Sequence, residues 1–204
     1  LKIKLKVVSL PTDVPNFDFM KTKDSVWKTL SSEYIFRRPW LTVRRDDMEL
    51  PNGNRIPEYY ILEYPDWVNM IAITRDNRFI FVHQYRPGIA RTCYELCAGV
   101  CETEDASPLV SAQRELLEET GYGDGNWQEY MALSPNPSTH TNVTYCFLAT
   151  DVEPIAPQHL EDTEDLTVHL LTLEEVKQLL LNNEIMQSLH AAPLWRYMAE
   201  KRLI

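Results

Sequence analysis

The sequence contains no run of 18 consecutive apolar residues, the length that a helix needs to cross a membrane. Its first residues, LKIKLKVV, alternate lysine with apolar residues as a strand does, and the apolar part is too short for a signal peptide. Basic residues are outnumbered, with 20 Lys and Arg against 30 Asp and Glu, so the formal net charge is −10. We therefore expect no membrane partner and no general nucleic-acid binding. A small anionic substrate is compatible with this charge, because bound cations can reverse the local field.

Cysteine is also scarce, with four in the chain: Cys93, Cys97, Cys101 and Cys146. Three of them recur at four-residue intervals, which raises the question of a zinc site. The nearest histidines, His83 and His140, do not complete a familiar zinc pattern with them. We expect buried, reduced thiols instead, and without secretory features this predicts a cytoplasmic protein.

The 204 residues, with 44% hydrophobic and 25% charged side chains, suit one globular domain with appendages. Period and turn residues predict two hairpins, a short strand, two further strands and two closing helices. In order, the expected strands cover residues 34–50, 55–64, 68–74, 79–86, 94–100, 144–152 and 167–173, with Asn52-Gly53 as the first turn. Thr172 and Glu175 predict a capping box for a helix over 173–181. This order indicates an α+β fold or an α/β/α sandwich.

The segment RELLEETGY places three carboxylates, Glu115, Glu118 and Glu119, at positions i, i+3 and i+4 of a predicted helix. Like charges at this spacing destabilise a helix unless a cation lies between them. A divalent metal is the natural candidate, because Mg²⁺ and Mn²⁺ favour carboxylate oxygens. A solvated acidic surface is the alternative for a helix rich in glutamate.

The residues around this cluster predict a helix with defined ends. Ser107 is a good N-cap, Pro108 suits the first helical position and Gly121 can end the helix in the left-handed conformation. An apolar stripe centred away from the carboxylates completes the pattern, formed by Leu109, Ala112 and Leu116.

The ordered sequence around the carboxylates resembles the Nudix box. The matching residues are Gly99, Arg114, Glu115, Leu116, Glu118, Glu119, Gly121 and Tyr122. One departure is an extra residue between Gly99 and Arg114, which leaves Ala106 where the box has its first glutamate. Asp105 or Glu104 must stand in for that glutamate, so we expect the loop before the helix to be reshaped.

Two upstream segments, VHQYRPG and YELCAG, resemble the Q-Y-R and E-L-P-A-G segments of the ADP-ribose and nucleotide-sugar pyrophosphatase branch, with Cys97 in place of the proline. This resemblance implies a Nudix-type α/β/α sandwich with a mixed sheet in residues 66–204. It also implies an N-terminal β-region, residues 1–65, that pairs two chains as a homodimer. The segment 134–142, SPNPSTHTN, lacks a glutamate found there in many members.

The resemblance further implies hydrolysis of the pyrophosphate bond in a nucleoside diphosphate linked to another group, with Mg²⁺ or Mn²⁺ as cofactor. It assigns metal binding to Glu115, Glu118, Glu119 and Gly99, catalysis to Glu118, Glu164 and Arg114, and substrate binding to Arg86 and Glu95. Glu164 is preferred to Glu161 as general base, because it precedes the strand in an E-x-apolar pattern.

Several alternatives stay open at this stage. Glu164 could belong to a solvated acidic loop, and Arg86 could form an ion pair instead of binding phosphate. An alternating aromatic strand, with Tyr34, Phe36 and Trp40, fits a core or an interface better than base stacking, and we expect His140 and His169 to be structural. At the level of function, the rivals are a non-catalytic sensor of a nucleotide sugar, a nucleoside-triphosphate pyrophosphatase and an isoprenoid diphosphate isomerase.

Overall fold

The computed structural model describes residues 25–38 and 41–204. The described residues divide into two compact units, one of residues 25–33 and 45–59 and one of residues 34–38, 41–44 and 60–204. The strand predicted in residues 1–8 lies outside the described residues. Within the described ranges, no helix has both the length and the apolar character needed to cross a bilayer.

A three-stranded sheet comes first, with β1 (Lys28–Arg38), β2 (Leu41–Glu49) and β3 (Arg55–Glu63) in the order β1-β2-β3. The predicted turn is confirmed, because Gly53 has φ +84 and its N–H donates to the Leu50 carbonyl over 2.9 Å. The prediction of one strand over 34–50 is wrong, since two neighbouring strands occupy it. Pro39 lies between these strands in the sequence, and proline has no N–H to donate to the hydrogen-bond ladder between two strands.

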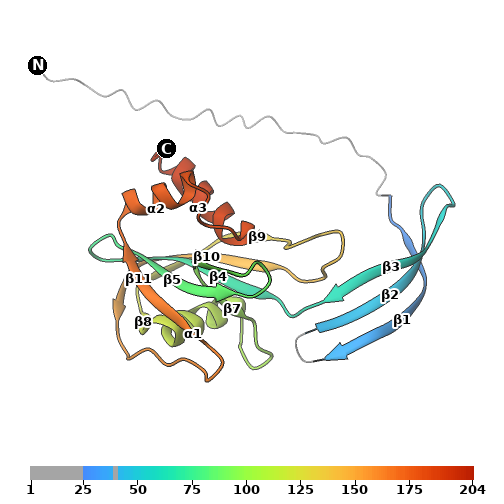
Figure 1. The fold of residues 1–204 in the computed structure, drawn as a ribbon, viewed down its shortest axis with the longest axis horizontal. Coiled ribbons are helices and arrows are strands. Elements are labelled where there is room, and N and C mark those ends of the chain that lie inside the picture. The colour runs from blue at the N-terminus through green and yellow to red at the C-terminus, as the bar shows by residue number, and fades with distance from the viewer. Residues whose placement is uncertain (1–24, 39–40) are drawn as a thin grey trace, which may run out of the picture. The chain divides into compact units, whose positions relative to one another are not determined.

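A second, mixed sheet forms the centre of the fold (Figure 1). Its strands are β4 (Trp67–Thr74), β5 (Phe79–Arg86), β6 (Arg91–Glu95), β7 (Cys97–Val100), β8 (Tyr122–Gly123), β9 (Asn126–Leu133), β10 (Thr144–Pro154) and β11 (Leu166–Leu171). The main path runs β11-β5-β4-β10-β8, while β6 pairs with β5, β7 with β4 and β9 with β10. The β4–β10 pair is parallel and the other neighbouring strands of this sheet are antiparallel, so the sheet is mixed.

The sheet divides in its middle, and this division positions the residues before the acidic helix. β4 and β5 pair only at Ala72–Ile80 and Ile73–Phe79. Beyond that point β7 pairs with β4 and β6 pairs with β5. The single strand predicted over 94–100 is therefore wrong: it is two strands that change ladder partner at Leu96.

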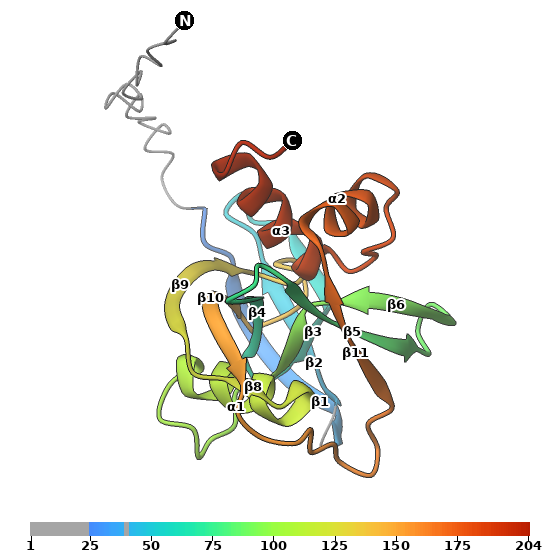
Figure 2. The ribbon, with the colours of Figure 1, turned by 90° about the vertical axis from the view of Figure 1, so that its left-hand side faces the viewer.

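Helices cover both faces of this sheet, with α1 (Pro108–Thr120) on one side and α2 (Leu173–Leu181) and α3 (Ser188–Glu200) on the other (Figures 1 and 2). Alternate residues of β4 face α1 on one side of the sheet and α2 with α3 on the other, because the side chains of successive strand residues point to opposite faces. Val68 packs in the core with Ala112 and Leu116 of α1, whereas Ile71 packs with residues of α2 and α3. The predicted α/β/α sandwich is confirmed.

The predicted helix ends are also confirmed. The Ser107 hydroxyl accepts the N–H of Val110 over 3.4 Å, and Gly121 ends α1 with φ +76. Thr172 and Glu175 form the predicted capping box of α2. The strand β9 has no counterpart among the sequence predictions.

Candidate active site

Arg114 lies at the centre of the acidic cluster on α1. Its guanidinium Nη1 contacts a carboxylate oxygen of Glu118 at 2.9 Å and one of Glu115 at 3.0 Å. Its Nη2 donates to the Val100 carbonyl over 3.0 Å and to Asp105 over 3.1 Å. Burial alone would lower the pKa of Arg114, but its hydrogen bond to Asp105 and the surrounding carboxylates hold that pKa above its usual range. Arg114 is therefore the cation that separates the like charges.

Asp105, not Glu104, takes the position opposite Arg114. Hydrogen bonds from Arg114 and Ser111 lower the pKa of the Asp105 carboxyl. Glu104 is exposed and accepts a hydrogen bond from the hydroxyl of its neighbour Thr103 over 2.9 Å. The extra residue in the loop therefore does not deprive Arg114 of a carboxylate partner. Asp105 provides it, and the preceding Glu104 does not.

Gly99 lies directly against the Glu115 carboxylate. A Cβ atom built at Gly99 would be only 1.9 Å from Cδ of Glu115, so any side chain there would displace the carboxylate. Burial raises the pKa of Glu115 to about 7, despite the opposing effect of Arg114. A glycine is needed here for the close approach of β7 to α1.

Glu119 lies one helical turn beyond Glu115 and is the most buried carboxylate of the cluster, with 4% of its surface exposed. It accepts the backbone N–H of Ala98 over 3.2 Å. Burial, followed by the charge of Glu115, raises the pKa of Glu119 to about 8. The charge of Glu164 acts in the same direction, so the predicted general base lies within electrostatic reach of α1.

The donor set suits a hard divalent cation. The half-buried Glu115 and the buried Glu119 lie beside each other and beside the Ala98–Gly99 backbone, and two such carboxylates are difficult to keep ionised without a cation. In the described part of the chain, no three acidic, histidine or cysteine side chains already converge on one point. Glu118 is hydrogen-bonded to Arg114. For one metal to be bound by all three glutamates, Glu118 must therefore release Arg114 and bind the cation instead.

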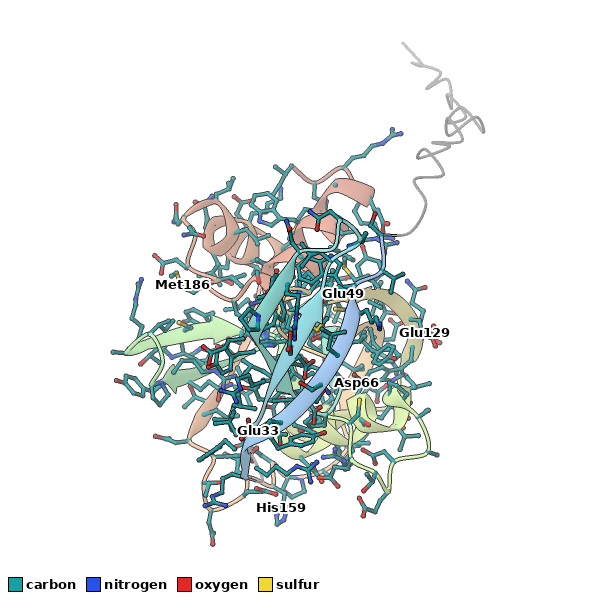
Figure 3. All side chains as sticks on the ribbon, turned by 90° about the vertical axis from the view of Figure 1, so that its right-hand side faces the viewer. Glu33, Glu49, Asp66, Glu129, His159 and Met186 are labelled. Atoms are coloured by element: carbon teal, nitrogen blue, oxygen red, sulfur yellow. The ribbon has the colours of Figure 1, made fainter. Side chains whose placement is uncertain are left out.

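The loop that carries Glu164 is tied to the end of α1. The Gly121 carbonyl accepts the N–H of Ile155 over 2.9 Å, and the Glu118 carbonyl accepts that of His159 over 2.9 Å. Gln158 adds a side-chain hydrogen bond of 2.6 Å to the Glu119 carbonyl, and Figure 3 labels His159 in this loop. Sequence reasoning missed Gln158, and no local pattern marks it.

A cavity of about 590 Å³ borders the Ala98–Val100 backbone. Its lining includes Arg86 and Glu95, which also bind each other, with Arg86 Nε 2.9 Å from a Glu95 oxygen. Glu95 is buried, and its hydrogen bond raises the pKa of Arg86. Both predicted substrate-binding residues, Arg86 and Glu95, therefore line the cavity. They also form an ion pair, which was the alternative interpretation for Arg86.

The remaining candidate residues lie elsewhere. Tyr34 and Phe36 on β1 are each 43% exposed, with the Arg37 guanidinium 3.6 Å from the Tyr34 ring centre. Trp40 lies outside the described residues. His140 packs against the rings of Tyr64 and Trp67, and its structural role stays a prediction.

His169 belongs to a second ring cluster, with His83 and Tyr94 at centroid distances of 5.6 and 5.3 Å. All four cysteines are free, three of them buried, in agreement with the expected reduced thiols. Burial raises the pKa of the Cys146 thiol to about 12.

Comparison with known proteins shows the family of this chain. The family described as the NUDIX domain matches residues 64–192, and the nucleoside diphosphate sugar hydrolase N-terminal domain matches residues 27–62. An ADP-ribose pyrophosphatase of Bacillus subtilis is 31% identical over 78% of this chain and 85% of its own length. A methanol dehydrogenase activator of Bacillus methanolicus is 31% identical over 79% of this chain and 86% of its own.

A solved structure described as an ADP compounds hydrolase shares the fold, with a TM-score of 0.72 at 23% identity, over 86% of this chain and 95% of that chain. The chain belongs to the Nudix family. The predicted resemblance and the enzyme class, a Nudix pyrophosphohydrolase, are confirmed by these matches.

Proposed function

We propose that this chain hydrolyses the pyrophosphate bond of ADP-ribose or of a similar nucleotide sugar, releasing a nucleoside monophosphate and a phosphorylated partner. The observation that carries the proposal is the pair of carboxylates, the half-buried Glu115 and the buried Glu119, against the Ala98–Gly99 backbone. The similarity to an ADP-ribose pyrophosphatase supports the choice of substrate class.

A divalent cation, Mg²⁺ or Mn²⁺, would be held by oxygens of Glu115, Glu118 and Glu119 and by the backbone carbonyl at Gly99. When bound, it supplies positive charge for the pyrophosphate oxygens and makes water a better nucleophile. Arg114 orients Glu115 and Glu118 through its contacts with both, and its hydrogen bond to the Val100 carbonyl ties α1 to β7.

Glu164 is the proposed general base, which takes the proton of the attacking water. Its loop is held against α1, and its charge already acts on Glu119. Arg86 and Glu95 bind the substrate in the cavity beside Gly99. Glu95 engages Nε and Nη2 of Arg86, which orients the guanidinium toward an incoming phosphate.

The test is hydrolysis of a panel in Mg²⁺ and separately in Mn²⁺. The panel contains ADP-ribose, ADP-glucose, UDP-glucose, GDP-mannose, NADH, diadenosine polyphosphates and a nucleoside triphosphate. We expect metal-dependent release of a nucleoside monophosphate, with kcat lowered by about a hundredfold or more in Glu119→Gln.

Glu129→Gln is the matched control, because Glu129 is an exposed glutamate on β9 that projects to solvent (Figure 3). Its turnover should equal that of the wild type. Tight metal-dependent binding of a nucleotide sugar without turnover would instead support the sensor, and preference for the triphosphate would support the other Nudix chemistry.

We also propose that residues 1–65 form a dimerisation region, separate from the Nudix domain in residues 66–204, and that two chains assemble through it. Every residue of β1 is exposed, and β1 lies at the edge of its sheet, where an unpaired strand is open to a partner. The free thiols support a place in the reducing cytoplasm.

A further inference from the structure

The cavity beside Gly99 is lined on the α3 side of the sheet by residues to which the reaction assigns no role. Leu189 and His190 of α3 and Met186, in the segment that joins α2 to α3 (Figure 3), meet the start of β4 and β10 there. Because the cavity also reaches Ala98–Val100, a group bound in it would be continuous with a pyrophosphate at the carboxylates.

The side chains on this face of the sheet change from apolar to polar where the face borders the cavity. β4 and β10 run parallel, so partner residues lie on the same face. Leu148 and Ile71 are one such pair and belong to the apolar core under α2 and α3. Two residues nearer the strand starts, Asn69 pairs with Cys146, and two residues nearer again Thr144 pairs with Trp67.

Asn69 is held in one orientation by the protein. Only 1% of it is exposed, and its Nδ2 donates to the Leu189 carbonyl over 2.9 Å. Because the amide nitrogen must face that carbonyl, Oδ1 is the free acceptor. Apart from the weakly polar thiol of Cys146, which interacts with the Asn69 side chain, no hydrogen-bond donor among the described residues reaches Oδ1, although leaving a buried acceptor unpaired destabilises a fold.

Thr144 repeats this situation two residues along the paired strands. It is 2% exposed, and its hydroxyl has no hydrogen-bond partner among residues 25–38 and 41–204. Valine has the same shape as threonine and favours strands equally well, so the stability of the fold does not explain why residue 144 carries a hydroxyl. Two buried, unpaired polar groups in one cavity wall indicate a ligand that pairs with them.

His190 adds an uncharged hydrogen-bond donor to the cavity wall. Its Nδ1 accepts the N–H of Leu96 over 2.9 Å, and burial lowers the pKa of the ring to about 4. The ring is therefore neutral at pH 7 and carries its proton on Nε2. The wall thus combines an acceptor, a hydroxyl and a neutral donor.

Neutral groups of this kind match hydroxyl groups better than a phosphate, which favours charged donors. Trp67 also lines the cavity, and its ring is held by Tyr64 at a centroid distance of 5.5 Å. A flat apolar wall beside several hydrogen-bonding groups suits a sugar ring, whose faces are apolar and whose edge carries hydroxyls.

From this arrangement we propose that Asn69 and Thr144 are specificity residues that hydrogen-bond the hydroxyl groups of the sugar attached to the distal phosphate. The inference rests on the proposed pyrophosphatase function and adds the subsite that recognises the group beyond the pyrophosphate. Binding of the nucleobase in this cavity is the competing outcome.

The experiment compares two substrates that differ only in the sugar: ADP-ribose and the β-methyl ester of ADP, which keeps the adenosine and the pyrophosphate. Thr144→Val removes one hydroxyl without changing shape, and Asn69→Leu removes the acceptor. We expect each variant to lower kcat/KM for ADP-ribose by about five- to tenfold and to leave the methyl ester unchanged.

Thr150→Val is the matched control, because Thr150 lies on the same strand but does not line the cavity. Its kcat/KM should match the wild type for both substrates, and thermal unfolding should show that all three variants fold. An equal loss for both substrates would overturn the proposal in favour of base binding or altered packing. Unchanged kcat/KM in Thr144→Val and Asn69→Leu would overturn it as well.

Failure of the proposed function has a different signature, namely a wild-type protein that cleaves neither substrate. The inference is then decided by calorimetric binding of ribose 5-phosphate, with AMP as comparator. Binding of ribose 5-phosphate that weakens about five- to tenfold in Thr144→Val, with AMP unaffected, supports the sugar subsite. Binding of ribose 5-phosphate that is absent or unchanged in the variant overturns it.

Discussion

At Gly99 the backbone of β7 runs so close to α1 that the Glu115 carboxylate occupies the place of a side chain. Gly99→Ala should therefore displace Glu115 and lower kcat by at least about tenfold, because its new Cβ would meet the carboxylate. Glu129→Gln is the control, since Glu129 is exposed on β9 and does not line the cavity. Hydrolysis rates and thermal unfolding of both variants check this, and full activity in Gly99→Ala would contradict the close approach.

His190 makes stability depend on pH. Burial lowers its folded-state pKa to about 4, below the 6.5 of a free histidine, so the unfolded chain binds a proton that the folded chain does not. The charges of Glu95 and Arg86 act on the ring in opposite directions. The stability that depends on a neutral ring is complete above pH 6.5 and decreases as the pH falls toward 4.

Between pH 7.5 and pH 5, His190 should lower the free energy of unfolding by about 2 kcal/mol. Urea unfolding of the wild type and of His190→Gln at both pH values isolates this contribution, because the raised pKa values of Glu115 and Glu119 change stability in the opposite direction in both proteins. His190→Gln, which can still accept the Leu96 N–H, removes the titrating ring, so its free energy of unfolding at pH 5 relative to pH 7.5 should be about 2 kcal/mol more favourable than that of the wild type. The same slope in the variant would show that other groups are responsible.

At the scale of elements, α1 carries the whole acidic cluster, and its start depends on one side chain. Ser107 caps the first turn by accepting the N–H of Val110. Ser107→Ala should lower the free energy of unfolding by about 1 kcal/mol, which corresponds to a Tm shift of about 2–4 °C in a domain of this size.

Ser107→Asp tests whether this loss comes from capping. Aspartate is an equally good cap and its charge is favourable at a helix N-terminus, so its Tm should stay within about 1 °C of the wild type. Differential scanning calorimetry of both variants is the measurement. Equal losses in the two would show that Ser107 contributes by packing instead.

At the scale of the whole molecule, the open question is whether two chains assemble through β1. This strand exposes Tyr34, Ile35 and Phe36 in succession, an unusual sequence for solvent. Sedimentation should give a mass about twice the 23.8 kDa of one chain. Ile35→Asp should shift it to the single-chain mass, because a buried charge without a partner opposes association.

Leu170→Asp is the control for this prediction. Leu170 is an exposed apolar residue on β11, an edge strand of the other sheet. Its variant should sediment as the wild type does. A single-chain mass for the wild type would remove the proposed role of residues 1–65.

Much of the site was predictable from the sequence because it is built on one helix. The spacing of Glu115, Glu118 and Glu119 places them on one edge of α1 by helical geometry alone, and Ser107 and Gly121 mark its ends. The capping box at Thr172 was predictable for the same reason. Strand boundaries were less certain, and the runs at 34–50 and 94–100 each proved to be two strands.

Contacts between distant segments were decided by the tertiary structure. The sequence left Asp105 and Glu104 as equal candidates, and the position of Arg114 selects Asp105. The unpaired groups of Asn69 and Thr144 give no local signal, because each lies in an ordinary strand sequence. Their significance depends on the β4–β10 register and on α3 closing over them.

The sequence by itself therefore determined the family, the acidic helix and the chemistry that its carboxylates allow. Helical geometry acts over three or four residues, so it can be read from spacing alone. The tertiary structure decided which carboxylate pairs with Arg114, how Glu119 becomes buried and what lines the cavity beside Gly99. Burial and ladder register depend on residues far apart in the chain, and local sequence does not encode which of them meet.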